Sequence, residues 1–225
     1  MYADVVINTP LEQRFTYQVG EGCEGACTGM RAIDPLGKRE VTGYIVALRE
    51  KIEPTSYQIK SLKRLVDKEP LFGARQIDLA RWMARFYLCS EGEALSTMIP
   101  GGRRDVDPQA LPVDEDAVEV ADEQLSEEQR QAIEAICSGE HSLHYLYGVT
   151  GSGKSEVFLR IAQRVIAAGR QVIYLVPEIT LTHQLARQVS RRFEGRVALL
   201  HSGMTPSQRL SAWRKIKEGG VELAI

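Results

Sequence analysis

The sequence lacks any uninterrupted run of about 18 apolar residues, the length that a membrane-spanning helix needs. Its first residues, MYADVVINTP, also lack the basic start and the long apolar stretch of a secretory signal. These two absences argue against a membrane partner and against export. We therefore expect a cytoplasmic location.

An excess of charge of one sign is missing as well. The 28 lysines and arginines nearly balance the 30 aspartates and glutamates, which leaves a net charge of −2. A nucleic-acid partner would have to be held by local basic patches, because electrostatic attraction depends on charges close to the phosphates. The hydrophobic fraction of 44% is enough for one large core or two smaller ones.

Cysteine is rare too, and the four are Cys23, Cys27, Cys89 and Cys137. Cys23 and Cys27 share a glycine-rich stretch, but no second pair and no histidines stand at the spacing of a zinc site. Reduced thiols and a zinc half-site are both compatible with this spacing. We expect thiols, and no zinc site in this chain.

The first 70 or so residues have a residue pattern that is typical of β-strands separated by turns. Short β-rich runs alternate with Gly, Pro and charged turns, and they are DVVINT, RFTYQV, GMRAIDPL and VTGYIVALRE. Residues 72–89 change to a helical period, with one apolar stripe formed by Leu79, Trp82, Met83, Phe86 and Tyr87. We predict a small, mostly β domain over residues 1–100 that includes this helix.

Residues 101–124 are rich in Gly, Pro and acidic residues without periodicity, which predicts a linker. From residue 125 to residue 225, helical and strand patterns alternate, with strands expected at 143–147, 172–176, 197–200 and 221–225. Helices are expected after Ser126, at 155–168, at 180–193 and after Thr205. The predicted fold class is α/β, a doubly wound parallel sheet after the small β domain.

One motif of this second part carries chemistry. The pattern G-x-x-x-x-G-K-[ST] is matched in full by Gly148, Val149, Thr150, Gly151, Ser152, Gly153, Lys154 and Ser155. A loop between a strand and a helix can surround a phosphate chain with backbone N–H groups, and its glycines permit the close approach. The expected strand before it and helix after it favour a nucleotide site over a mere glycine-rich turn.

The pattern predicts ATP and Mg²⁺ as cofactors. Lys154 would lie between the β and γ phosphates, and the Ser155 hydroxyl would bind the Mg²⁺. Gln129 stands three residues after Ser126, where it can cap the helix, or its amide can pair with the adenine edge. Two further loops follow predicted strands on the same sheet edge, at Glu178 and at His201. They are ordinary turns, or they face a DNA strand.

Four stretches in this half are LSEEQRQAIEAI, YGVTGSGKSEVFL, YLVPEITLTHQLARQ and LLHSGMTPSQRLSAW. Together they resemble the primosomal protein N′ family, superfamily 2 DNA helicases of bacterial replication restart. The resemblance implies an incomplete RecA-like lobe, an ATP-dependent 3′-to-5′ helicase activity, and an adenine contact for Gln129. It also implies partners: forked DNA, primosome proteins and single-stranded DNA-binding protein.

The first half resembles the same family's DNA-binding domain, which holds the 3′ end of a nascent strand at a fork. The resemblance is carried by PLEQRFTYQV, DPLGKREVTGYIV, IKSLKRLVDKEPLF and ARWMARFYLCSEGEAL. It implies DNA contacts by Phe15, Tyr17, Gly37, Lys38 and Lys60. Period-two spacing makes Phe15 and Tyr17 equally compatible with a base-stacking surface and with a core face. The lysines supply charge for phosphates, or belong to a solvated loop.

Three departures from the family pattern affect these expectations. Thr16 stands where an acidic residue is common, which puts recognition of the terminal hydroxyl in doubt. The linker is too short for the family's winged-helix domain, since an independent domain needs about 50 residues. The later motor motifs, the second lobe and the family's zinc insertion would lie after Ile225, so we expect a fragment that binds DNA and ATP without hydrolysis. The alternatives are a DNA-fork-binding module without a motor and a P-loop kinase.

Overall fold

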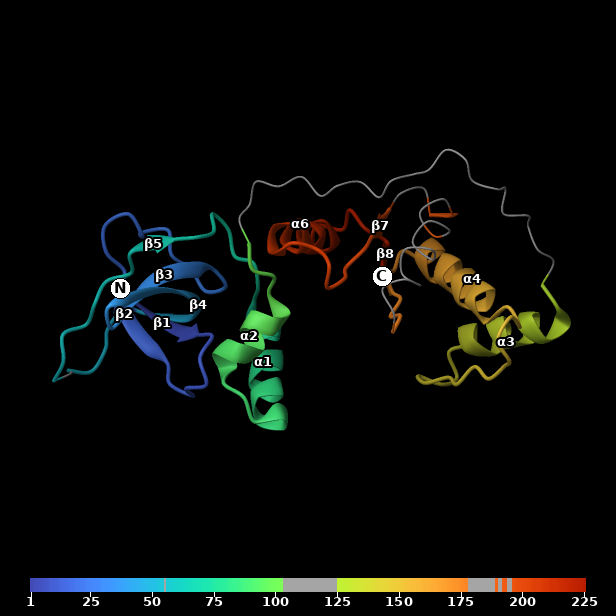
Figure 1. Cartoon of the computed structure of the whole chain (residues 1–225), viewed down its shortest axis with the longest axis horizontal. Helices are drawn as coiled ribbons and strands as arrows, with labels where there is room; N and C mark the ends of the chain where they lie inside the picture. Colours follow the sequence, from blue (N-terminus) through green and yellow to red (C-terminus); the bar gives the residue numbers. More distant parts are fainter. Residues whose placement is uncertain (55, 103–124, 178–188, 190–191, 194–195) are drawn as a thin grey trace. The chain divides into compact units, whose positions relative to one another are not determined.

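The structure, a computed structural model, describes residues 1–54, 56–102, 125–177, 189, 192–193 and 196–225 (Figure 1). These residues form two compact units, Met1–Gly101 and Gly102–Ile225. The expected linker therefore lies almost wholly outside the described residues, as do most of the expected helix at 180–193 and Glu178. No helix among the described residues is both long and apolar enough to cross a bilayer.

The first unit is built on an antiparallel sheet. Its strands are β1 (Tyr2–Ile7), β2 (Phe15–Gln18), β3 (Arg31–Leu36), β4 (Arg39–Arg49) and β5 (Arg64–Leu65). They lie in the order β2-β1-β4-β3-β5, so each of the four predicted β-rich runs forms a strand. The inward side chains of alternate positions, such as Ala3, Val5 and Ile7 on β1, meet in one core with Ala32 and Ile45.

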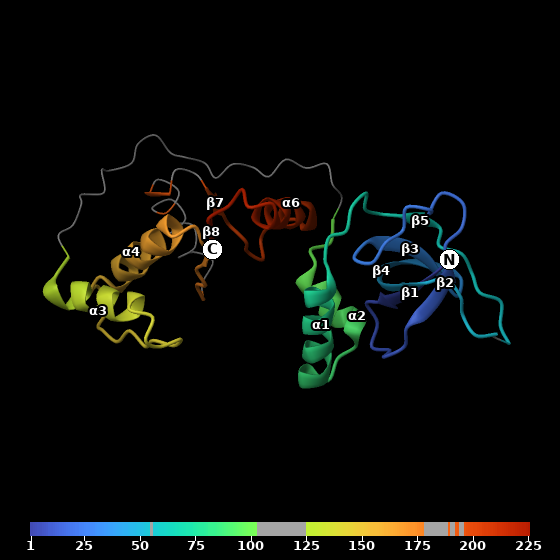
Figure 2. The same ribbon diagram turned by 180° about the vertical axis from the view of Figure 1, so that it is seen from behind.

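Two helices accompany this sheet, α1 (Ala74–Tyr87) and α2 (Glu91–Met98), and both views place them side by side (Figures 1 and 2). Ser90 caps α2: its hydroxyl accepts from the N–H of Glu93 and donates to the carbonyl of Thr9. Gly92 permits close packing on β1, because a Cβ there would lie 1.9 Å from the carbonyl oxygen of Ile7.

Helix α1 forms close to the predicted bounds, but the side chains that it buries differ from the predicted stripe. Ile77 and Ala80 are buried. Most of the stripe is exposed, at 47% for Leu79, 54% for Trp82, 65% for Phe86 and 63% for Tyr87. The helix therefore buries the face that bears Ile77 and Ala80, and the large side chains of the stripe lie mostly on the other side. The helical period was thus predicted correctly, whereas the residue pattern did not indicate which face of the helix is buried.

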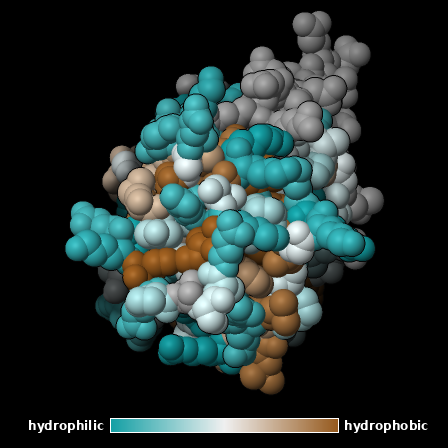
Figure 3. Space-filling view, turned by 90° about the vertical axis from the view of Figure 1, so that its left-hand side faces the viewer, coloured by the Kyte–Doolittle hydropathy of each residue, from teal (hydrophilic) through white to brown (hydrophobic). Residues whose placement is uncertain are grey.

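A buried ion pair fixes the segment before α1. Arg31 and Asp67 are each 3% exposed, and the guanidinium makes two hydrogen bonds to the carboxylate, at 3.0 and 2.9 Å. The Arg31 backbone N–H donates to the same carboxylate at 2.9 Å, so its charge is well compensated. The face in Figure 3 shows hydrophobic atoms in a central band and in smaller patches among hydrophilic ones.

The second unit contains α3 (Glu127–Cys137), α4 (Lys154–Ala167) and α6 (Pro206–Lys217). Its strands β6 (Val172–Ile173), β7 (Val197–Ala198) and β8 (Leu223–Ala224) form a parallel sheet in the order β6-β8-β7. Both expected capping boxes are present, Ser126 with Gln129 and Thr205 with Gln208. This α/β arrangement, a β domain followed by a partial parallel-sheet lobe, confirms the predicted fold class.

The predicted strand at 143–147 is not a strand in the structure. A strand needs a hydrogen-bonded neighbour, and among the described residues of this unit β6, β8 and β7 pair with one another and not with this segment. Its alternate side chains point to solvent: Leu143 is 87% exposed, Tyr145 88% and Tyr147 84%. The segment nevertheless leads directly into the loop at 148–153, as the motif requires.

Candidate functional site

The loop at 148–153 lies immediately before helix α4, so the first N–H groups of that helix face the loop. Gly151 has a φ of 83° and Gly153 a φ of 79°, a region in which other residues are strained. Gly153 is also the N-cap of α4, where a Cβ would lie 2.2 Å from the amide nitrogen of Gln129. Two glycines of the motif are therefore required by the backbone itself.

Lys154 folds back over this loop. Its ammonium donates to the carbonyls of Gly148 and Val149, each at 2.7 Å. The charge therefore already lies inside the loop that would surround a triphosphate. The next residue, Ser155, is exposed in the first turn of α4, where its side chain forms a hydrogen bond with Tyr174. This donor set fits a nucleotide with Mg²⁺: an ammonium and backbone amides for the phosphates, and a hydroxyl for the cation.

Gln129 connects the start of α3 to the same loop. Its side-chain oxygen accepts from the Ser126 N–H at 2.9 Å, and its amide group donates to the carbonyl of Ser152 at 3.1 Å. The capping role is therefore present in the structure. The contact with Ser152 also places the Gln129 side chain directly against the glycine-rich loop, and the adenine contact stays a prediction.

A second ion-pair cluster, which sequence reasoning missed, lies one residue beyond Ser155. Both carboxylate oxygens of Glu156 pair with Arg192, at 2.6 and 2.7 Å, and one also accepts from Arg160 at 2.7 Å. The hydrogen bond to Arg192 is the main cause of a lowered pKa at Glu156. The spacing of Glu156 and Arg160, four residues apart on α4, was the available signal, whereas Arg192 is distant in sequence.

His201 follows β7 in a turn, where its Nδ1 accepts from the backbone N–H of Gly203 at 3.1 Å. This hydrogen bond is the contact expected if His201 belongs to an ordinary turn, one of the two alternatives for this loop. Tyr174, which follows β6, packs its ring edge-on against Phe158 of α4 at 6.0 Å between centroids. Burial raises the pKa of Tyr174.

In the first unit, the candidate DNA contacts divide between the surface and the core. Lys38 and Gly37 form the exposed turn between β3 and β4, and the Lys60 ammonium donates to the Gly37 carbonyl at 3.1 Å. Phe15 is partly buried and packs against the core. The structure thus brings Lys60, Gly37 and Lys38 together, although 22 residues separate Lys38 from Lys60.

Tyr17 is 4% exposed and belongs to the core, so its ring cannot serve as a base-stacking surface in this conformation. Of the two possibilities that the period-two spacing allowed, a base-stacking surface or a core face, Tyr17 occupies the core face. Its hydroxyl donates to the Pro35 carbonyl at 3.3 Å, which supports the strand leading to Gly37. Burial, and next the charge of Asp34, raise the pKa of Tyr17 to about 12.

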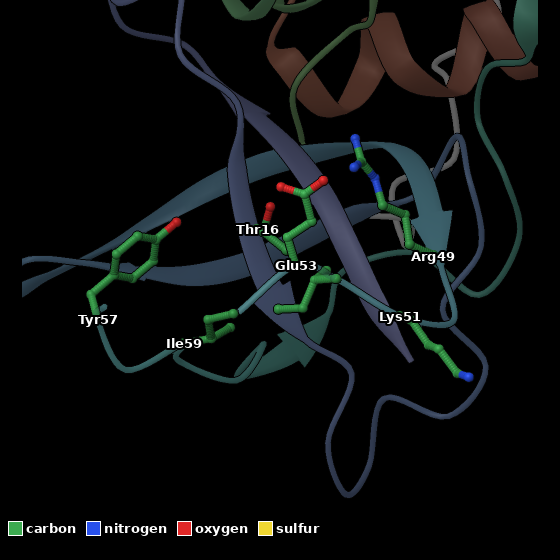
Figure 4. Close-up of a pocket in the computed structure, with 7 residues that line it drawn as sticks. Thr16, Arg49, Lys51, Glu53, Tyr57 and Ile59 are labelled. Atoms are coloured by element: carbon green, nitrogen blue, oxygen red, sulfur yellow. The ribbon is translucent and has the colours of Figure 1, made fainter. Parts of the chain in front are cut away.

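Thr16 points to the opposite side of β2. Its hydroxyl donates to Asp4 at 2.9 Å, in the register that pairs these two residues across β1 and β2. The Arg49 guanidinium lies 2.6 Å from the other oxygen of Asp4, and Arg49 and Thr16 both line the pocket shown in Figure 4. A carboxylate thus lies directly behind Thr16, on the neighbouring strand. This arrangement could not be predicted from the residue pattern, because the pairing register decides it.

The two cysteines of the glycine-rich stretch belong to the interior. Cys23 is fully buried in the core, and Cys27 packs against it. Within the described residues, no group of three or more His, Cys, Asp or Glu side chains could hold a metal ion.

Comparison with known proteins separates the same two parts. Residues 4–100 match the model of a 3′ DNA-binding domain, and residues 126–225 match that of the DEAD/DEAH box helicases. The chain is 40% identical to the replication restart protein PriA of Treponema pallidum over 224 residues, which are 96% of this chain and 34% of that protein.

Two further relatives carry the same description. The replication restart protein PriA of Borreliella burgdorferi is 26% identical over 97% of this chain and 34% of its own length. That of Bacillus subtilis is 43% identical over 45% of this chain and 13% of its own length. The chain thus spans about a third of the length of the two relatives that it matches almost throughout.

Proposed function

Because this chain belongs to the PriA family of replication restart proteins and corresponds to an N-terminal portion of them, we propose that it binds a DNA end and ATP for a replication-restart helicase. The first unit would hold DNA, and the second would bind ATP with Mg²⁺. Working together in the family's complete protein, they would take part in ATP-driven unwinding in the 3′-to-5′ direction. Primosome proteins and single-stranded DNA-binding protein are the further partners that we propose.

The nucleotide half of this proposal is supported above all by the position of Lys154. Its ammonium lies in the loop of carbonyls and amides at the start of α4. ATP would replace the two carbonyl contacts with phosphate oxygens, and Ser155 would supply a ligand to the Mg²⁺. Bound Mg²⁺ would neutralise charge that develops on the phosphates. The helicase match over residues 126–225 favours this assignment over a P-loop kinase.

The DNA half is supported by the cluster of Lys60, Gly37 and Lys38. Two exposed ammonium groups flank a turn whose φ of 61° at Gly37 leaves the backbone uncovered, since a Cβ there would meet nothing within 4 Å. Phosphate oxygens can therefore approach both the cations and the backbone. The 3′ end of a nascent strand is the ligand that we propose for this turn. Phe15 would contact it from β2, and Tyr17 would act from the core, through its hydrogen bond to the Pro35 carbonyl.

Forked DNA with a free or a phosphate-blocked 3′ end tests the DNA half. We expect the chain to bind the free end several-fold more tightly in fluorescence anisotropy, because a terminal phosphate adds bulk and charge at the turn. Lys60→Ala should weaken binding and reduce the salt dependence by about one counterion. Lys68→Ala, an exposed lysine of the same unit, is the control. Equal affinity for the free and the blocked 3′ end would contradict recognition of the DNA end. If the chain does not bind DNA even at low salt, the DNA-binding part of the proposal is wrong and only the proposed ATP binding remains.

A further inference from the structure

Tyr174 follows β6 directly and is held by both the sheet and a helix of the second unit. Its backbone N–H donates to the carbonyl of Ala224 on β8 at 2.8 Å. Its side chain is partly buried and packs against the core of this unit. The ring stands edge-on to that of Phe158 on α4, with 6.0 Å between the centroids and 78° between the planes. The position of the ring is therefore fixed from two sides.

The hydroxyl of this tyrosine reaches the residue that the glycine-rich motif assigns to the Mg²⁺. It forms a side-chain hydrogen bond with Ser155, in the first turn of α4. Ser155 and Phe158 are three residues apart on this helix and lie on the same face, so one tyrosine contacts both of them. The other two candidate side chains, Lys154 and Gln129, are held by carbonyl groups of the loop itself.

A serine hydroxyl serves as a metal ligand only when one of its lone pairs faces the cation. It carries one O–H donor and two lone pairs, and its proton turns towards whichever acceptor is near. A hydroxyl that donates to the Tyr174 oxygen keeps both lone pairs for a cation. Burial raises the pKa of Tyr174, so the phenol stays protonated at neutral pH and adds no negative charge beside the phosphates.

We propose that Tyr174 is a positioning residue of the nucleotide site, which holds the Ser155 hydroxyl in the orientation that a Mg²⁺ ligand requires. Ser155 donates to the Tyr174 oxygen and turns a lone pair of its own oxygen towards the cation. Because Phe158 and the sheet fix the ring, the hydroxyl needs little reorientation when the nucleotide binds. The inference rests on the proposed ATP binding, and it adds to the site a residue that lies outside the motif at 148–155.

The test measures binding of a fluorescent ATP analogue to the whole chain over a range of Mg²⁺ concentrations, and again in EDTA. Tyr174→Phe keeps the ring beside Phe158 and removes the hydroxyl. It should raise the Mg²⁺ concentration needed for half-maximal binding about tenfold, the loss typical of a group that orients a metal ligand. Affinity in EDTA should not change. Tyr145→Phe, the same change at an exposed tyrosine of this unit, is the control and should alter neither quantity.

A second comparison places Tyr174→Phe in a Ser155→Ala background. A residue that acts only through Ser155 has no further effect once that hydroxyl is gone, so the double variant should bind like Ser155→Ala alone. A packing role for Tyr174 would instead weaken binding in both backgrounds and in EDTA as well.

An unchanged Mg²⁺ dependence in Tyr174→Phe, or an equal loss of affinity in EDTA, would overturn the positioning role. The proposed ATP site would survive that result if Lys154→Ala still weakens binding of the analogue. Absence of binding by the unmodified chain in the presence of Mg²⁺ would overturn the ATP site and the positioning role together.

Discussion

Lys154→Ala should reduce the affinity of the chain for a fluorescent ATP analogue by about a hundredfold. The ammonium contacts two carbonyls of the loop at 2.7 Å and would exchange them for phosphate oxygens. Removing the cation that would pair with a bound triphosphate costs about 2–5 kcal/mol, which corresponds to about 30-fold or more in affinity. Titration of the analogue with the chain in the presence of Mg²⁺ measures this loss directly.

Loss of binding in that variant must be separated from loss of the loop itself. Lys215→Ala removes an exposed lysine from α6 of the same unit and should leave the affinity unchanged. Lys154→Arg keeps a cation that can still reach the two carbonyls, but its planar fork suits the phosphate position poorly, so binding should remain weak. If Lys154→Ala binds the analogue as tightly as the unmodified chain, the nucleotide site is refuted.

The sequence predicted the glycine-rich loop well because the motif is local. The loop, its glycines and the helix after it are consecutive in the chain, and the α4 helix follows where its period placed it. The strand at 143–147 was predicted wrongly because pairing is not local, and an apolar alternating run does not specify its neighbour. The Glu156–Arg192 contact escaped prediction for the same reason, since 36 residues separate the two.

In the first unit, alternation predicted the strands but could not decide which face is inward. Tyr17 turned out to lie in the core, and the α1 stripe turned out to face solvent. Gly92 lets α2 approach β1 closely, and this effect depends on the packing partner rather than on the helical period. The Asp4–Thr16 contact depends on strand register, which hydrophobic pattern alone leaves open across a β1–β2 pair.

A buried carboxyl is the least expected feature of the first unit. Asp34 is 0% exposed, and neither of its side-chain oxygens has a hydrogen-bond partner. Gly43 makes room for it, since a Cβ there would lie 2.3 Å from one of these oxygens. Burial without compensation penalises the charged form and raises the pKa of Asp34 from 3.8 to about 7.

The direction of the resulting pH dependence follows from the protons bound by each state. Between pH 4 and pH 7 the folded unit holds a proton on Asp34 that the unfolded chain has released. The free energy of unfolding therefore falls as the pH rises through this window, and it is constant for this group outside it. A shift of this size corresponds to a loss of about 4 kcal/mol at pH 8 relative to pH 4.

Asp34→Asn should abolish this dependence and stabilise the first unit at pH 8 by about 2 kcal/mol, because the gain of about 4 kcal/mol is partly offset by an unpaired amide. Urea unfolding at several pH values measures the free energy of unfolding of the first unit. Trp82 fluorescence reports on this unit in a Trp213→Phe background, because the two tryptophans lie in different units. Asp78→Asn, in an exposed pair with Arg81, should change little. If Asp34→Asn retains the slope of the unmodified chain between pH 4 and pH 7, another group carries it, and Asp34 is charged in the folded unit.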